Sequence, residues 1–152
     1  MKKIFDIILL LSMMFLLCAS ITSCGSQNMQ ESAEPGSVDV DLSKLSGTLA
    51  YSQVTNMMYN PDEYIGKTVK ATGLYYASYS EETDLYYHLV VVGDETSCCQ
   101  QGLEFVLKGE HNYPDDYPKE RTKIEVTGVF GSYEELGGTY YFLTADDITA
   151  IE

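Results

Sequence analysis

The chain has 152 residues, and its 23 acidic side chains against 9 basic ones give a formal net charge of −14. This excess of negative charge disfavours nucleic-acid binding, which depends on neutralising phosphates, and it leaves no basic patch for anionic lipid. With 13 tyrosines, 12 glycines and no tryptophan, the composition is typical of β-strands, and the length fits one domain behind an N-terminal leader.

The first 23 residues have the three parts of a secretory signal. Lys2 and Lys3 precede an apolar stretch, residues 4–19, and small residues stand directly before Cys24. Residues 21–25, Ile-Thr-Ser-Cys-Gly, resemble the lipobox of bacterial lipoproteins. That resemblance implies cleavage after residue 23, a diacylglyceryl group on the Cys24 thiol and an acyl chain such as palmitate on its amine. The alternative is an uncleaved anchor, but the apolar stretch is shorter than the ~20 residues that span a bilayer.

Cleavage would remove Lys2, Lys3 and Asp6 and lower the formal net charge from −14 to −15. The resemblance implies a lipid anchor on the extracytoplasmic side of a membrane of the bacterial cell envelope. Residues 25–37 are rich in Gly, Ser, Gln, Asn and Glu, and residues 24–46 are expected to form a flexible tether. Residues 47–152 are then the folded domain.

Residues 49–59 predict a helix, preceded by a short strand pattern at residues 38–42. Four side chains recur at three- and four-residue spacings and define its apolar face: Tyr51, Val54, Met57 and Met58. Thr48 is a candidate N-cap, and Pro61 ends the helical pattern.

Five strand patterns follow, at residues 68–79, 85–92, 103–108, 123–130 and 139–143. Residues 80–84 and residues 133–138 are acidic, and the second segment also contains glycine, so each predicts the turn of a hairpin. Residues 109–120 predict a surface loop. Gly73 and Gly128 interrupt two of the strands. A bend at Gly73 is expected to let Leu74 and Tyr76 continue the face begun by Val69.

Residues 64–73, Tyr-Ile-Gly-Lys-Thr-Val-Lys-Ala-Thr-Gly, resemble the opening of tRNA-anticodon-like OB domains in bacterial envelope proteins. Residues 124–128 are similar to the fourth strand of such domains. The resemblance implies a mainly β fold, a small five-stranded OB-like barrel preceded here by one short α-helix. Two features depart from it: the loop at 109–120 replaces the usual helix between strands three and four, and the basic residues of a nucleic-acid face are missing.

OB domains bind ligands over their second and third strands, between two of their loops. In this chain those loops are residues 80–84 and 132–138, and both are acidic. The expected ligand face comprises Tyr86, His88, Glu81, Glu82, Glu134 and Glu135. Such a face would repel anions and accept a cation, a basic peptide or a neutral ligand. The alternative is that these turn residues are simply polar and solvated.

Cys98 and Cys99 form the only adjacent cysteine pair, and they resemble an element of uncharacterised bacterial membrane proteins. Three interpretations stay open: a strained redox-active disulfide, a metal site with His88 or His111, and structural cysteines. The metal interpretation lacks the usual ligand spacing, so no metal or cofactor is predicted.

No nucleophile elbow, phosphate loop or zincin motif is present, so no catalytic residue is predicted. The leading hypothesis is a non-enzymatic envelope lipoprotein whose OB-like domain binds a partner protein or a small ligand. The alternatives are a thiol redox or metal protein centred on Cys98 and Cys99, and single-stranded nucleic-acid binding by fold analogy, which the charge disfavours.

Overall fold

A computed structural model describes residues 37–93 and 99–152 of the chain. The predicted signal peptide, most of the predicted tether, Cys24 and Cys98 lie outside these described residues. The lipidation of Cys24 and the state of the cysteine pair therefore stay predictions.

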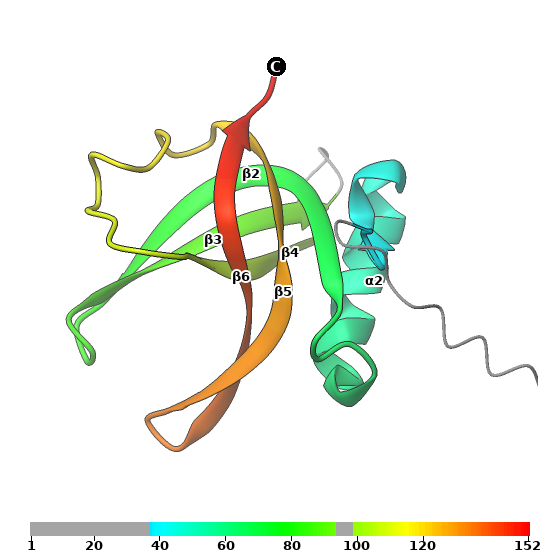
Figure 1. Cartoon of the computed structure of the whole chain (residues 1–152), viewed down its shortest axis with the longest axis horizontal. Helices are drawn as coiled ribbons and strands as arrows, with labels where there is room; N and C mark the ends of the chain where they lie inside the picture. Colours follow the sequence, from blue (N-terminus) through cyan, green and yellow to red (C-terminus); the bar gives the residue numbers. More distant parts are fainter. Residues whose placement is uncertain (1–36, 94–98) are drawn as a thin grey trace, which may run out of the picture. The chain divides into compact units, whose positions relative to one another are not determined.

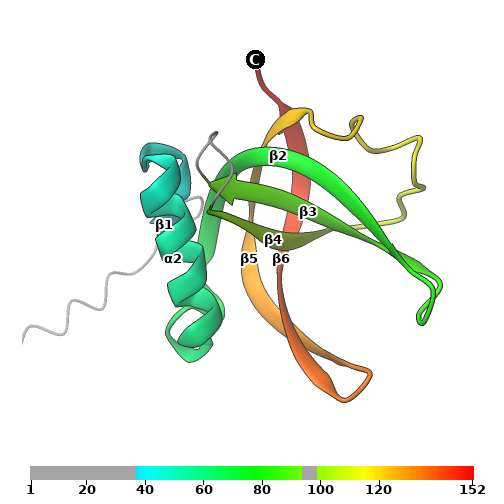
Figure 2. The same cartoon turned by 180° about the vertical axis from the view of Figure 1, so that it is seen from behind.

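The described residues form a mainly β domain that contains one α-helix (Figures 1 and 2). Its elements are β1 (Val40–Asp41), η1 (Leu42–Lys44), α2 (Gly47–Tyr59), η2 (Pro61–Glu63), β2 (Thr68–Ser80), β3 (Leu85–Gly93), β4 (Gln100–Leu107), β5 (Lys123–Glu135) and β6 (Gly138–Ala150). The predicted helix, five strands and two hairpins are confirmed, although β4, β5 and β6 are longer than the sequence patterns indicated.

Strands β2 to β6 close into a barrel in the order β2-β3-β4-β6-β5, because β2 also pairs with β5. The pairings are antiparallel except for β4 with β6, which run parallel. This is the connectivity of an OB-like barrel, so the predicted fold class is confirmed. In Figure 1, β2 arches across the barrel from its pairing with β5 to its pairing with β3.

Alternating side chains of the five long strands fill the barrel, as expected when successive residues point to opposite faces. The fully buried side chains of this core include Tyr75, Val90, Phe105, Ile124, Phe130 and Leu143. One expectation was wrong: Tyr75, not Leu74 or Tyr76, continues the buried face of Val69 and Ala71. The strand keeps its alternation through Gly73 instead of shifting by one residue.

Gly73 is the point where β2 changes partners. Its N-terminal part pairs with β5 as far as Leu74, and its C-terminal part pairs with β3 from Leu74 onward. A Cβ atom at Gly73 would lie within 2.2 Å of the Val91 carbonyl oxygen. The close passage of the two backbones therefore requires glycine.

Helix α2 covers one end of the barrel and contacts β3 and β4 (Figure 2). Its buried side chains are Ala50, Val54 and Met57, while Tyr51 and Met58 are only partly buried. The helix begins at Gly47 with Ser46 as its N-cap, so the prediction of Thr48 was two residues late.

The chain before α2 also packs on the barrel. Val40 and Asp41 pair in parallel with Val69 and Lys70, and the side chain of Leu42 is buried. The packed unit therefore includes residues that precede residue 47. The sequence predicts that the domain starts at residue 47. Within the described ranges, no helix combines the length and apolar character that crossing a bilayer requires.

Replacing Gly73 with alanine is expected to destabilise the barrel by about 3 kcal/mol, because the new methyl group collides with backbone atoms of β3. Gly131→Ala is the matched control, since its Cβ would meet only Phe142 at 3.5 Å. Its free energy of unfolding should stay within about 0.5 kcal/mol of the wild type. Urea unfolding of both variants measures the difference, and equal midpoints would contradict the close-approach argument.

Candidate functional site

A groove with a volume of about 330 Å³ lies between the β2–β3 hairpin and the β5–β6 hairpin. Both hairpins project from the barrel on the side away from α2 (Figures 1 and 2). The groove is lined by Ser78, Ser80, Glu82, Tyr87, Leu89, Glu104, Tyr133, Glu135, Leu136 and Tyr140. None of these ten residues is basic and three carry carboxylates, so the surface is acidic and rich in tyrosine.

Strand alternation selects which side chains reach this groove. On β3, His88 and Val90 point into the barrel, so the intervening Leu89 and the preceding Tyr87 point outward. On the other hairpin, Tyr133 and Tyr140 are paired across β5 and β6, and their rings stack with centroids 5.5 Å apart. Each hairpin thus presents aromatic side chains on its groove side.

Two tyrosine–carboxylate hydrogen bonds organise the groove. The Tyr87 hydroxyl donates to Oε2 of Glu135 at 2.5 Å, which joins the two hairpins directly. The Tyr133 hydroxyl donates to Glu104, with 3.0 Å to Oε2 and 3.2 Å to Oε1. The Thr83 hydroxyl lies 2.9 Å from the Tyr87 oxygen and supports it from the turn.

The protonation properties of these groups reflect their shared environment. Burial raises the pKa of Glu104, and the nearby negative charge of Glu135 raises it further, while the hydrogen bond from Tyr133 opposes the shift. Burial and the neighbouring Glu104 raise the pKa of Tyr133, and donation to Glu135 raises the pKa of Tyr87. Both tyrosines therefore remain protonated donors, and a bound cation would relieve the repulsion between the two carboxylates.

The acidic residues expected from the sequence separate into two sets. Glu82 and Glu135 line the groove, whereas Glu81 is exposed in the turn and does not line it. Glu134 lies on the opposite face of its hairpin, where the Thr139 hydroxyl donates to its carboxylate at 2.7 Å. The two neighbouring glutamates thus provide a matched pair, one inside the groove and one outside.

Tyr86 and His88 do not reach the groove, because both share the inward-facing phase of β3. His88 is 9 % exposed, and its ring stacks on Tyr117 with centroids 3.7 Å apart. Its Nδ1 is 2.8 Å from the hydroxyl of the fully buried Tyr75. The Tyr86 ring packs against Tyr113 at 4.3 Å.

These contacts form an aromatic cluster, with His88 and Tyr75 buried and Tyr86 47 % exposed, that fastens the 108–122 loop to the barrel wall. Tyr113 and Tyr117 come from the loop, and Tyr75, Tyr86 and His88 come from β2 and β3. Burial lowers the pKa of His88 from 6.5 to about 4, so the ring is neutral at physiological pH. His88 is thus a packing residue that holds the loop.

Eight of the ten lining residues are absent from the ligand face that the sequence predicts, among them Tyr87, Glu104, Tyr133 and Tyr140. Glu104 sits in an alternating strand pattern, and its outward position was the available signal. The tyrosines occur as adjacent pairs or single residues, and the sequence does not tell which member of a pair faces outward.

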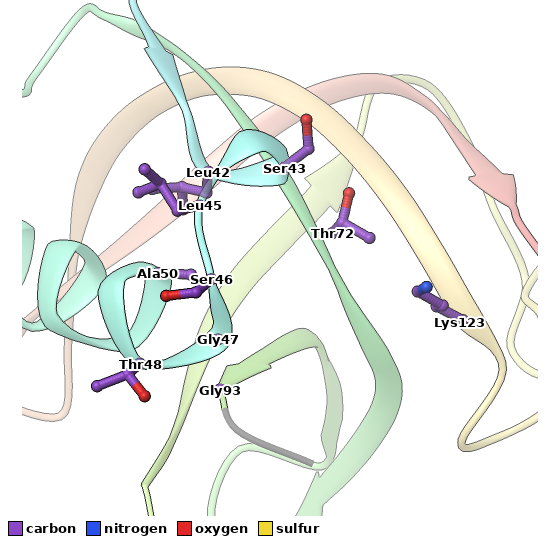
Figure 3. A pocket seen from close by; sticks show the side chains of 10 residues that line it. All are labelled: Leu42, Ser43, Leu45, Ser46, Gly47, Thr48, Ala50, Thr72, Gly93 and Lys123. Atoms are coloured by element: carbon purple, nitrogen blue, oxygen red, sulfur yellow. The ribbon is translucent and has the colours of Figure 1, made fainter.

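A second pocket, of about 560 Å³, borders the start of α2 (Figure 3). The first turn of the helix, the Thr72 hydroxyl and the Lys123 ammonium group surround it, a set that suits an anion. However, the side chains of Ser43, Ser46, Thr48 and Lys123 are exposed to solvent. No buried polar side chain among the described lining residues points to a ligand, so the candidate site is the groove.

Cys99 is partly exposed and directly precedes β4. Among the residues that the structure describes, no group of three or more His, Cys, Asp or Glu side chains could hold a metal ion. His111 lies in the exposed loop with Nε2 3.0 Å from the Lys108 carbonyl oxygen. Neither histidine is placed with Cys99 in such a group.

Comparison of the chain with protein-family models, with curated proteins and with solved structures finds no match. The candidate site therefore rests on the geometry and electrostatics of the groove.

The buried His88 is expected to make stability depend on pH. The unfolded chain binds a proton at this residue near pH 6.5, but the folded protein binds it only near pH 4. Its contribution to stability is therefore complete above pH 6.5 and is lost as pH falls toward 4, by on the order of 3 kcal/mol. Urea unfolding of wild type and His88→Phe across this range should show a smaller slope in the variant.

An NMR titration of the His88 imidazole checks the argument without relying on variant folding. A His88 signal that titrates near pH 6.5 would contradict the assignment of His88 to the desolvated interior.

Proposed function

We propose that this protein is a lipid-anchored lipoprotein on the extracytoplasmic side of a bacterial envelope membrane, and that its barrel binds a partner protein without catalysing a reaction. The observation that supports binding is the groove between the two hairpins, with its tyrosine rings and its coupled carboxylates. Tyrosine suits protein recognition because it offers a large rigid ring and a hydrogen-bonding hydroxyl.

The hairpins also carry exposed apolar residues, of which Leu136 lines the groove. Leu136 is 60 % exposed at the β5–β6 turn, and Leu85 is 52 % exposed where β3 leaves its own turn. Apolar side chains around a polar centre favour a protein surface over a single small ion, because they offer contact area that a small ion would leave exposed. A small neutral or cationic ligand is the closest alternative for the same groove.

The nucleic-acid alternative is disfavoured by the same lining. Carboxylates of Glu82, Glu104 and Glu135 would face phosphates with no basic lining residue to neutralise them. The thiol alternative requires Cys98, which lies outside the described residues.

The anchor is supported by the sequence around Cys24 and by the physical adequacy of lipidation. One acyl chain gives only reversible membrane binding, whereas two or more hold a protein stably. A lipoprotein modification would thus keep the binding domain beside the membrane.

Substitution Cys24→Ala is expected to abolish incorporation of labelled fatty acid and to release the protein from the membrane fraction. Cys18→Ala is the control: this residue lies in the predicted leader, so its loss should leave labelling unchanged. Metabolic labelling with a clickable palmitate analogue measures both. Persistent labelling of the Cys24→Ala protein would refute the anchor.

Partner capture should depend on the groove. Full-length tagged protein, cross-linked in membranes and purified in detergent, is expected to retain a partner that Glu135→Gln loses by at least several-fold. Glu134→Gln, on the opposite face of the same hairpin, should retain it. Quantitative mass spectrometry compares the three samples. A partner retained equally by all three would contradict binding in the groove.

A further inference from the structure

One strand edge beside the groove has no strand partner among the described residues. Strand β6 pairs with β5 from Gly138 through Phe142 and beyond, but its pairing with β4 begins only at Phe142, opposite Glu104. Within residues 37–93 and 99–152, residues 138–141 make no strand pairing and no backbone hydrogen bond on the β4 side. The four residues thus have one satisfied edge and one open edge.

This open edge lacks the features that usually protect a strand end. Its sequence, Gly-Thr-Tyr-Tyr, contains neither the lysine nor the proline that commonly blocks the pairing of another strand. The edge is also next to the groove, since Tyr140 belongs to it and lines the groove. An extended chain could therefore form backbone hydrogen bonds here, as in recognition by strand addition.

The side chains of an added strand would alternate between the two faces of the hairpin. Those on the face of Tyr133 and Tyr140 would point toward Glu104 and Glu135, which repel each other and have no basic neighbour in the lining. Lysine or arginine at these positions would match the carboxylates, and the tyrosine rings would hold their aliphatic stems and cationic heads. On the other face, Tyr141 stacks on Phe130, which suits apolar side chains.

We propose that the partner is recognised through an extended segment with basic side chains at alternate positions, and that this segment adds as a strand to the open edge of β6. The inference rests on the proposed function, because it identifies the kind of segment that the groove accepts. It adds two requirements: backbone pairing at residues 138–141, and cationic side chains facing Glu104 and Glu135.

The test uses full-length protein in detergent and a fluorescent hexapeptide of alternating lysine and valine. Fluorescence anisotropy should show saturable binding that weakens as salt is added. A hexapeptide of three lysines followed by three valines has the same charge, so it controls for attraction to the acidic protein as a whole. It should bind at least about fivefold more weakly, and an equal affinity would overturn the proposal.

N-methylation of the peptide backbone tests strand addition itself. Only every second amide of an added strand points toward the edge that it joins. Methylating the amides of one alternate set should therefore weaken binding roughly tenfold, while methylating the other set should change it little. If both methylated peptides bind with equal affinity, strand addition is overturned, and only binding of the cationic side chains in the groove is left.

The glutamate pair tests the side-chain requirement. Glu135→Gln should weaken the alternating peptide about fivefold, and Glu134→Gln should not. Equal affinities of the two variants would overturn the proposed facing of basic side chains to Glu135. If no peptide binds but a natural partner is still lost on Glu135→Gln, strand addition fails and the proposed function stands. If the partner is retained by both variants, the proposed function fails.

Discussion

The fold depends on one close approach between backbones, at Gly73 of β2. There β2 leaves β5 and joins β3, so a single strand closes the barrel by serving two neighbours. The Val91 carbonyl oxygen occupies the space that any side chain at this position would need. Because the barrel is closed here, both hairpins are held at fixed positions on its wall. The groove between them follows from that closure and not from any long loop.

The alternation of side chains along the strands then divides the tyrosines into two sets, one packed against the loop and one lining the groove. On β3, Tyr86 and His88 face inward and fasten the 108–122 loop, while Tyr87 faces outward and joins the second hairpin through Glu135. Burial within the aromatic cluster lowers the pKa of His88 and keeps its ring neutral. The groove is open enough to keep its carboxylates available. One strand thus supplies both packing that stabilises the wall and side chains that line the groove.

Periodicity predicted the helix and the five strands because the apolar positions of Val54 and Met57, and of Leu103 and Phe105, repeat at the spacing of each element. Where two tyrosines are adjacent, it was harder to predict which of them faces the core. Tyr75 and Tyr76 are chemically equal candidates for the core, and only the geometry of β2 at Gly73 decides between them. Glu104 was missed for a related reason: its environment is made by Tyr133, which is distant in sequence and approaches only after the barrel closes.

The two tyrosine hydroxyls give the carboxylates of the groove their hydrogen-bond donors. Tyr87 donates to Glu135 and Tyr133 donates to Glu104. A carboxylate can accept about four hydrogen bonds, so a cationic side chain can add its own without displacing the tyrosine. Binding of the proposed basic segment would then cost little reorganisation. It would also offset the repulsion from Glu135, which adds to the effect of burial in raising the pKa of Glu104.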